Sequence, residues 1–233
     1  MDTPYFHHPR LPEAGSIVEL TEDTARHVVS VLRMQEGEPI ILVDGHGSLG
    51  HAVILHVGKK KCSVRIASVE MHPDDRPPVS IAVSPVKNAA RYEWMVEKLA
   101  EIGIRRIIPL LTERTVRERM RADRLQSITI SAMLQSQQAW MTEVSAPSSL
   151  AELLKEGDFT RRYIAHCLPD TRSPLRNEAR SSSPVLMLIG PEGDFTPAEI
   201  QEALKAGFVP VSLGENRLRT ETAAVVAAVL LAV

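Results

Sequence analysis

The sequence predicts an α/β protein built from two domains, and three observations lead to this prediction. From Val79 onward, short apolar runs alternate with helical patterns, as they do where helices cover a parallel sheet. In the first part of the chain, short strand patterns follow one another closely, which is typical of a small β-barrel. Residues 72–78 are rich in proline and charge and indicate a linker. We therefore expect a barrel at 1–70, a linker at 71–78 and an α/β domain at 79–233.

The composition is that of an ordinary globular protein. Apolar residues make up 44% of the 233 residues and charged residues 24%. The formal net charge of −2 excludes a chain coated in positive charge, but it does not exclude a local basic face. The two cysteines, Cys62 and Cys167, are far apart and lack metal-binding spacing, which favours a reducing compartment. Because no signal peptide or membrane-spanning apolar run is found, we expect a cytoplasmic protein without a metal site or membrane contact.

The expected barrel consists of short strands separated by turn residues. Its strand patterns lie at 15–20, 39–45, 51–57 and 61–69. A short helix is expected at 21–33, with Thr21 or Asp23 as its N-cap. The apolar side chains of this helix that we expect to face the core are Val28, Val31 and Leu32.

The α/β domain begins with a strand, a helix and a second strand. The helix, expected at 88–102, has apolar residues at helical spacing and ends at Gly103. The flanking strands are expected at 79–84 and 104–111. The elements expected next are helices at 121–141 and 148–157 and a strand at 162–167, which ends in His166 and Cys167.

The most informative stretch combines a strand, a tight turn and a helix start. Residues 185–189 form a continuous apolar run, the pattern of a strand covered on both faces. Residues 190–193, Gly-Pro-Glu-Gly, suit a type I turn. Residues 196–199, Thr-Pro-Ala-Glu, have the form of a helix capping box, and Gly207 suits the end of that helix.

A second strand, loop and helix start follow about 25 residues later. A strand is expected at 209–213, and a glycine-bearing loop begins at Gly214. Ligands of parallel α/β sheets bind beyond the carboxyl ends of the strands, so we expect the two loops to form two walls of one pocket. The final segment, 221–233, is apolar on every side, which indicates a helix buried in the core or against another subunit.

The two loops give the chain a specific resemblance. Ile-Gly-Pro-Glu-Gly at 189–193, followed by Leu-Gly-x-x-x-Leu-Arg-Thr-Glu-Thr-Ala at 213–223, resembles the SPOUT methyltransferase class. Within that class, the chain is similar to the family that methylates N3 of a uracil in 16S ribosomal RNA. Further matches to the family pattern lie at 31–34, 44–45, 85–88, 97–104 and 108–110.

The resemblance implies a fold, a cofactor and partners. The end of the chain is expected to form an α/β trefoil knot that holds S-adenosylmethionine, and residues 1–70 a PUA-like RNA-binding barrel. The expected partners are 16S ribosomal RNA within the small ribosomal subunit, and a second copy in a homodimer formed through the knotted domain. The chain departs from the common family pattern at Leu134, Gln138 and Thr142, so we assign no RNA contact to that helix.

The cofactor is expected at the two loops and at the end of the strand at 162–167. Glycines there allow the backbone to approach the adenosine closely. The residues that the resemblance implies in cofactor binding are His166, Leu188, Ile189, Gly190, Pro191, Glu192, Gly193, Leu213, Gly214, Asn216, Leu218, Thr220, Thr222 and Ala223.

RNA contacts are expected in the N-terminal domain, since the family uses this region on RNA. The three lysines at 59–61 form either a phosphate contact or a solvated hairpin tip. The candidate RNA-binding residues are Arg10, Arg26, His27, Arg33, Lys59, Lys60 and Lys61.

Methylation of uracil N3 requires removal of a weakly acidic proton and stabilisation of the negative charge left on the ring oxygens. Arg219 and Glu221 are the candidate catalytic residues, because they flank Thr220 at the second loop. Glu221 is a candidate to accept the proton or orient the base, and Arg219 to stabilise the oxygen or hold a phosphate. The structural alternatives are a bond from Arg219 to loop carbonyls, and a first-turn carboxylate at Glu221 that the helix dipole favours.

The function that we expect is therefore S-adenosylmethionine-dependent N3-methylation of a uracil in small-subunit ribosomal RNA. One alternative is a ribose 2′-O-methyltransferase of the same fold class. The other is a non-catalytic RNA-binding assembly factor that keeps the pocket, against which the intact Gly-Pro-Glu-Gly and Arg-Thr-Glu-Thr motifs argue.

Overall fold

The chain forms two compact units in a computed structural model that describes residues 3–58, 61–116, 120–168, 172–178 and 182–233. The N-terminal unit consists of residues 1–75 and 133–141, and the α/β unit of residues 76–132 and 142–233. Residues 133–141, from the middle of the chain, belong to the first unit. The two units therefore cannot be described by one interval of sequence each. The domain limits expected above, 1–70 and 79–233, stay a prediction.

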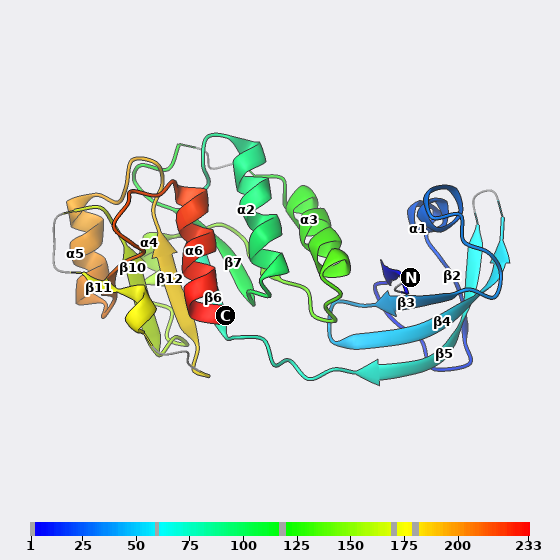
Figure 1. Ribbon diagram of the computed structural model, residues 1–233. Helices are drawn as coiled ribbons and strands as arrows, with labels where there is room; N and C mark the ends of the chain where they lie inside the picture. Colours follow the sequence, from blue (N-terminus) through cyan, green and yellow to red (C-terminus); the bar gives the residue numbers. More distant parts are fainter. Residues whose placement is uncertain (1–2, 59–60, 117–119, 169–171, 179–181) are drawn as a thin grey trace. The chain divides into compact units, whose positions relative to one another are not determined.

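The N-terminal unit is a five-stranded sheet with the order β1-β3-β4-β5-β2 (Figure 1). Its strands are β1 (Tyr5–His7), β2 (Ile17–Glu19), β3 (Pro39–Val43), β4 (Ser48–Val57) and β5 (Cys62–Met71). β1 was not predicted from the sequence; it pairs in parallel with β3, while the pairs β3–β4, β4–β5 and β2–β5 are antiparallel. Alternate side chains of the strands, including Ile40, Leu42 and Ile54, fill the core of this unit.

The helix expected at 21–33 is present but changes type. It starts as α1 (Glu22–Arg26) and continues as one π-helical segment, His27–Val31. Of the two predicted caps, Thr21 is the N-cap, since its hydroxyl accepts a hydrogen bond from Thr24 N at 3.3 Å. The cap confirms the predicted helix start.

The expectation that Val31 and Leu32 face the core is wrong. Val28 is fully buried, but Val31 is 65% exposed and Leu32 44% exposed. A π-helical turn contains more residues than an α-helical turn, so side chains that follow it no longer lie on the stripe predicted from α-helical spacing. Arg33 then adopts a left-handed backbone with φ of 56° and turns the chain away from the helix.

The α/β unit contains an eight-stranded sheet with the order β11-β13-β10-β12-β6-β7-β8, in which β9 also pairs with β7. Its strands are β6 (Val79–Val83), β7 (Arg106–Leu111), β8 (Glu143–Val144), β9 (Ser148–Ser149), β10 (Arg161–Ala165), β11 (Ser173–Pro174), β12 (Val185–Ile189) and β13 (Val209–Ser212). The pairings among these strands are parallel. Their carboxyl ends therefore meet at one edge of the sheet.

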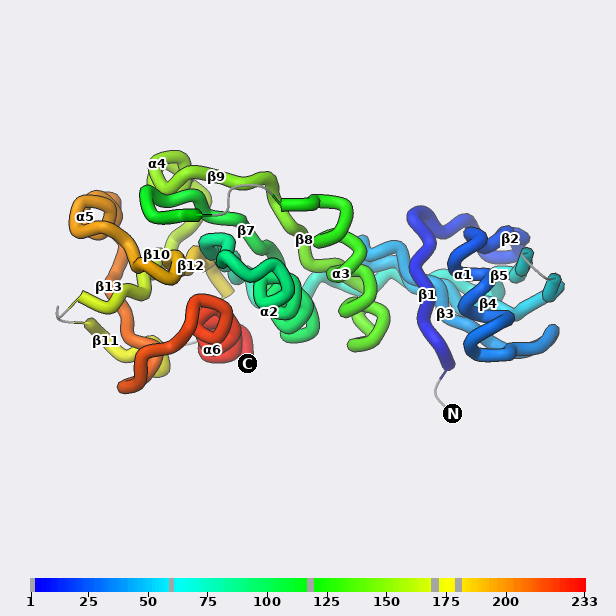
Figure 2. Tube along the Cα trace, turned by 90° about the horizontal axis from the view of Figure 1, so that it is seen from above, coloured from blue at the N-terminus to red at the C-terminus, as the bar shows by residue number. Residues whose placement is uncertain are grey.

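Helices cover both faces of this sheet. They are α2 (Ala89–Glu101), α3 (Ala122–Gln135), α4 (Leu150–Leu153), the 3₁₀ segment Leu175–Asn177, α5 (Pro197–Lys205) and α6 (Thr220–Ala232). Figure 2 shows α2 and α6 on one side of the strands and α4 and α5 on the other. The side chains of β12 alternate accordingly: Met187 and Ile189 join the core under α2 and α6, whereas Leu186 and Leu188 join the core under α5.

Capping side chains define the starts of the helices at the carboxyl edge. Asn88 Oδ1 accepts a hydrogen bond from Ala90 N at 2.9 Å and begins α2, which ends before Gly103 with its φ of 83°. At α5, Thr196 Oγ1 accepts from Glu199 N at 3.3 Å, and Glu199 Oε2 accepts from Thr196 N at 2.8 Å. The predicted capping box is confirmed, and so is the glycine stop of α2.

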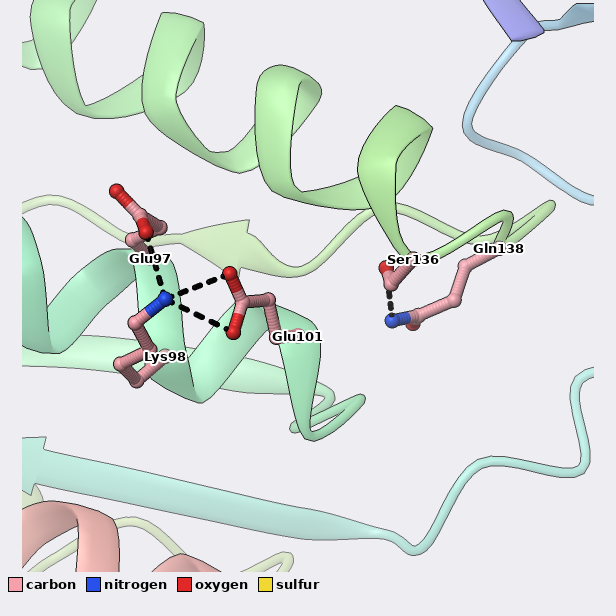
Figure 3. A network of polar contacts seen from close by, with 5 residues as sticks. All are labelled: Glu97, Lys98, Glu101, Ser136 and Gln138. Carbon is pink, nitrogen blue, oxygen red and sulfur yellow. Dashed lines mark hydrogen bonds and ion pairs between the residues drawn. The ribbon is translucent and has the colours of Figure 1, made fainter. Parts of the chain in front are cut away.

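The helix expected at 121–141 is shorter, because α3 ends at Gln135. Gln137 has a φ of 57°, which an α-helix does not permit. In the turn that follows, Gln138 Nε2 donates a hydrogen bond to Ser136 Oγ at 2.7 Å (Figure 3). The residues after this turn belong to the N-terminal unit, where Trp140 Nε1 donates to a backbone carbonyl of residue 72 at 3.1 Å.

An ion-pair network lies on the surface of α2. Lys98 Nζ donates hydrogen bonds to Glu97 Oε1 at 2.7 Å and to Glu101 Oε1 at 2.8 Å (Figure 3). These bonds, and first of all the one to Glu101, raise the pKa of the Lys98 ammonium group above its usual value. Because Lys98 is only partly buried and its carboxylate partners also reach solvent, the network contributes little to stability.

Within the single chain the last helix is only partly buried, so its predicted burial against another subunit stays a prediction. Ala224, Ala227 and Ala228 are fully buried, but Val229 is 42% exposed and Val233 70% exposed. One apolar stripe of α6 therefore reaches the surface. Of the helices that the structure describes, none is both long enough and apolar enough to cross a bilayer.

Candidate active site

One large cavity opens at the carboxyl ends of β10, β12 and β13. Its volume is about 720 Å³, which lies within the range of small-molecule sites. The walls are the loop after β12, the loop after β13, the end of β10 and the first turn of α6. The prediction that the two motif loops form two walls of one pocket is confirmed.

Most of the residues predicted to bind the cofactor line this cavity. They are His166, Ile189, Gly190, Pro191, Glu192, Leu213, Gly214, Asn216, Leu218, Thr220 and Ala223. The two candidate catalytic residues, Arg219 and Glu221, line it as well. The geometry thus brings both groups together, while the role of each residue stays a prediction.

Three predicted cofactor residues lie away from the cavity lining. Leu188 is on the opposite face of β12 from Ile189, as strand alternation requires. A Cβ built on Gly193 would contact the Arg114 side chain at 3.4 Å, outside the cavity. Thr222 is two residues beyond Thr220 on α6 and therefore projects from a different side of the helix.

The turn after β12 is shifted by one residue from the predicted 190–193. Asp194 N donates a hydrogen bond to Pro191 O at 2.9 Å, so the turn runs from Pro191 to Asp194. Asp194 has a φ of 62°, a conformation that Asp tolerates because its carboxylate bonds locally. The carboxylate accepts hydrogen bonds from Phe195 N and Cys167 N, both at 2.8 Å. This side chain ties the loop after β12 to the end of β10.

Neighbouring loops hold the same turn from its other side. Glu192 Oε1 accepts a hydrogen bond from Lys87 N, in the loop between β6 and α2, at 3.0 Å. Arg114, which follows β7, donates from Nη1 to Gly193 O at 2.7 Å. Loops that follow three different strands therefore fix the turn, and this wall of the cavity is pre-organised.

A further hydrogen bond joins the two loops to each other. The buried Thr220 hydroxyl donates to Gly190 O at 3.1 Å. Gly190 also leaves little room for a side chain, since a Cβ there would lie 3.1 Å from the Phe195 ring. This close packing is against Phe195, and the expected close approach of the glycine backbone to the adenosine stays a prediction.

The cavity wall holds a buried carboxylate beside an exposed guanidinium. The Glu221 side chain is 9% exposed, and its Oε1 lies 3.8 Å from Nε of Arg91 on α2. At this distance the two groups form an ion pair but no hydrogen bond. Arg219 occupies the N-cap position of α6 and is exposed. Within the described chain its guanidinium donates to no loop carbonyl, which disfavours the structural alternative for Arg219.

Sequence reasoning missed several residues of the cavity. They are Arg91, Ala165, Cys167, Arg172, Asp194, Val211, Ser212, Glu215 and Arg217. Asp194 had a signal, because it follows the Gly-Pro-Glu-Gly motif directly. Arg91 had none, because it lies about 130 residues from its partner Glu221 in the chain and reaches the cavity only through the packing of α2 against α6.

The RNA candidates that the structure describes lie exposed on the N-terminal unit. They are Arg10, Arg26, His27, Arg33 and Lys61. Two of them form ion pairs, Arg26 with Asp23 at 3.0 Å and Lys61 with Glu19 at 3.0 Å. Lys59 and Lys60 lie outside the described residues. The contribution of all seven residues to RNA binding stays a prediction.

Models of known protein families match residues in both units of this chain. The family model for an RNA methyltransferase domain matches residues 74–232, and the model for an RNA methyltransferase PUA domain matches residues 20–67. The ribosomal RNA small subunit methyltransferase E of Synechocystis sp. is 28% identical and aligns with 90% of this chain and 71% of its own length.

Two solved structures that resemble this chain contain bound S-adenosylmethionine. Ribosomal RNA small subunit methyltransferase E from Neisseria gonorrhoeae, bound to S-adenosyl methionine, is 30% identical with a TM-score of 0.87, and the match covers 98% of this chain and 96% of that one. A Legionella pneumophila protein described as a methyltransferase, with the bound cofactor SAM, is 33% identical with a TM-score of 0.89, covering 99% and 97%.

The fold and the cavity define an α/β methyltransferase of the SPOUT trefoil-knot class with an N-terminal PUA-like domain, which confirms the predicted fold class. The chain belongs to the RNA methyltransferase family, whose model matches more than half of its residues.

Proposed function

We propose that this protein transfers a methyl group from S-adenosylmethionine to N3 of a uracil in 16S ribosomal RNA of the small subunit. The observation that carries the proposal is the cavity itself. Two loops tied together by the bond from Thr220 to Gly190 enclose it, and Arg219 and Glu221 stand on its wall. Support also comes from relatives named as small-subunit ribosomal RNA methyltransferases over almost the whole chain.

The residues of the cavity fit S-adenosylmethionine. The volume of about 720 Å³ accommodates a nucleoside with an amino-acid side chain. Leu213, Leu218 and Ala223 supply apolar surface for a flat base, and the backbone of the two loops supplies donors and acceptors for its edge. The buried Glu221 carboxylate offers a negative charge to a positively charged ligand. When bound, the cofactor supplies the methyl group.

The chain contributes position and charge to the reaction. Holding the two reacting atoms in line removes much of the entropic barrier of a bimolecular displacement. Glu221 accepts the N3 proton or orients the base, and Arg219 stabilises the negative charge that develops on the neighbouring ring oxygen. Arg219 and Glu221 both lie at the start of α6. We therefore assign both roles to the same end of the cavity.

The RNA is proposed to contact the N-terminal unit as well. Around the π-helical segment, Arg26, His27 and Arg33 present positive or polar groups beside the exposed apolar side chains of Val31 and Leu32. Such a mixture suits RNA, because cations bind phosphates and apolar side chains make contacts with bases.

The active form is proposed to be a homodimer that joins through α6. Val229 on α6 and Val233 just after it expose apolar surface, and Val225, Val226 and Leu230 are partly exposed on the same helix. A contiguous apolar stripe of this kind on a helix marks an interaction site more often than a free surface. We further propose that the substrate is recognised within the small ribosomal subunit and that the protein is cytoplasmic.

Analysis of modified nucleosides tests the proposed reaction. The purified protein is incubated with S-adenosylmethionine and either protein-free 16S ribosomal RNA or small ribosomal subunits, and the digested RNA is examined by mass spectrometry. We expect N3-methyluridine, in higher yield from subunits. A 2′-O-methylated nucleoside would establish the ribose methyltransferase alternative instead, and the absence of methylation from both RNAs would favour the assembly factor.

A further inference from the structure

The N-terminal unit carries a net negative charge and the α/β unit a net positive charge. This difference is unexpected if the N-terminal unit is the one that binds RNA. Residues 1–75 contain seven Lys and Arg but eleven Asp and Glu, whereas residues 76–233 contain twenty and eighteen. RNA phosphates respond to the local positive field. The α/β unit, rather than the N-terminal unit, therefore holds the excess of positive charge.

Several cations near the cavity are already engaged with groups of the protein. Arg114 donates to Gly193 O, Arg172 donates to His166 O, and Arg91 pairs with Glu221. Their donors hold the fold or the cavity wall. They are therefore poorly placed to take up a phosphate without loosening the site.

Two other cations at the mouth have no such engagement. The side chains of Lys87 and Arg217 are exposed, and neither forms an ion pair or a hydrogen bond with any part of the chain that the structure describes. Arg217 lines the cavity. Lys87 adjoins it, since its own backbone N–H donates to the lining residue Glu192 at 3.0 Å. The backbone of Lys87 is held by this bond, and neither cationic side chain has a partner among the described residues.

The strands that lead to these two cations are separated by two other strands of the sheet. Lys87 follows β6 and Arg217 follows β13, and β12 and β10 lie between those strands. Three strand spacings correspond to roughly 14 Å. A single-stranded RNA segment that crosses the mouth thus meets one cation before the cavity and one after it.

We propose that Lys87 and Arg217 bind the RNA phosphates on the two sides of the target nucleotide and hold the strand over the cavity. A base that undergoes chemistry must leave its stack and enter the pocket, and clamping the backbone on both sides holds it there. This inference rests on the proposed function in one respect, that RNA is the substrate. It assigns the contacts nearest the reacting base to the α/β unit, and leaves the N-terminal unit to recognise more distant RNA.

The salt dependence of RNA binding tests this assignment. The probe is protein-free 16S ribosomal RNA, bound by the wild-type protein and by Lys87→Ala, Arg217→Ala and the double variant over a range of salt concentrations. Each lost phosphate contact should reduce the slope of log affinity against log salt by about 0.7, the value for single-stranded nucleic acid. The double variant should lose about twice as much, and Lys87→Arg should keep the wild-type slope.

Lys205→Ala is the matched control. Lys205 is also an exposed lysine without an ion pair among the described residues, but it lies in the last turn of α5, about 13 Å along that helix from its start at the cavity edge. Unchanged slopes in Lys87→Ala and Arg217→Ala, or an equal loss in Lys205→Ala, would overturn the inference. The assay needs no turnover, so its outcome is separate from the methylation test: wild-type protein that methylates RNA while both variants bind normally refutes only the two phosphate contacts.

Discussion

At the scale of single residues, the shape of the cavity depends on side chains that bond to backbone groups. Asp194 accepts from Cys167 N, Glu192 accepts from Lys87 N, and Thr220 donates to Gly190 O. Each bond crosses from one loop to another. These side chains therefore position the walls, whereas the Arg219 side chain forms no such bond within the described chain.

Arg219→Ala should separate catalysis from binding. We expect this variant to retain its fold and its affinity for S-adenosylmethionine, because the exposed guanidinium holds no loop carbonyl within the described chain. Methyl transfer should fall by about two orders of magnitude or more, as it does when other electrostatic stabilisers of developing charge are removed. Single-turnover methylation and calorimetric titration of the cofactor provide the two measurements. Near-normal turnover would assign Arg219 a structural role.

The two glycines of the first loop should respond differently to the same substitution. In Gly190→Ala the new methyl group would lie 3.1 Å from the Phe195 ring, so the ring or the loop must move and cofactor affinity should fall severalfold. In Gly193→Ala the nearest atom is Arg114 Cδ at 3.4 Å, an ordinary contact at the side chain of a flexible residue. Calorimetric titration of both variants is the test. Equal losses would contradict this reading of the loop.

At the scale of elements, the helix starts around the cavity combine local capping with long-range bonds. The Glu199 carboxylate serves the capping box of α5 through Oε2 and also accepts a hydrogen bond from Glu113 N through Oε1 at 2.8 Å. Capping therefore links α5 to the chain that follows β7. The loop after β12 is held at both of its ends in consequence.

Removal of the α5 cap should have a measurable cost. Thr196→Ala deletes the hydroxyl that accepts from Glu199 N, and an N-cap change of this kind lowers the free energy of unfolding by about 1 kcal/mol. For a chain of this length we expect the melting temperature to fall by about 2–4 °C. Thr196→Ser keeps the hydroxyl and is the control. A loss in the serine variant as large as in the alanine variant would show that packing of the methyl group, rather than capping, matters here.

The exposed stripe of α6 leads to a prediction about assembly. Val229→Asp should yield a monomer, because the substitution places an unpaired charge in the proposed dimer contact. Val229 is 42% exposed in the single chain, so the monomer itself should still fold. Val209→Asp, at a position that is 44% exposed but outside α6, is the matched control. Sedimentation of both variants gives the answer, and a dimeric Val229→Asp protein would exclude this stripe from the interface.

At the scale of the whole molecule, the proposed function distributes RNA contacts over two units. The N-terminal unit carries exposed Arg26 and Arg33 near the π-helical segment, yet its acidic residues outnumber its basic ones. Binding by this unit must then depend on a local basic face and not on its net charge.

Charge reversal on that face tests its contribution. Arg26→Glu with Arg33→Glu should weaken binding of 16S ribosomal RNA and flatten its salt dependence, because two phosphate contacts are lost. Cofactor affinity should not change, since the cavity lies within the α/β unit. Reversal of Lys61, which pairs with Glu19 as Arg26 pairs with Asp23, provides a comparison with an ion-paired cation at another place on the same unit. If the double reversal leaves RNA affinity intact, this face is a solvated surface.

Much of the fold was predictable because it depends on neighbours in sequence. The strand at 185–189, the capping box at Thr196 and the glycine stop at Gly103 all follow from local rules of alternation, capping and left-handed backbone. The errors arose where a local rule was extended too far. Val31 and Leu32 were placed by α-helical spacing, but the chain there is π-helical, and the turn after β12 moved by one residue because Asp194 accepts two bonds that its sequence position does not reveal.

By itself, the sequence determined most of the longer strands and helices, the two loops that enclose the cavity and the resemblance that points to methyl transfer to RNA. Tertiary structure alone decided that Arg91 meets Glu221, that Leu188 faces away from the cavity while Ile189 faces it, and that residues 133–141 join the N-terminal unit. The physical reason is the range of the forces involved. Capping, turns and alternation act between residues a few positions apart, whereas contacts across the cavity depend on the spatial order of the strands, which no short stretch of sequence encodes.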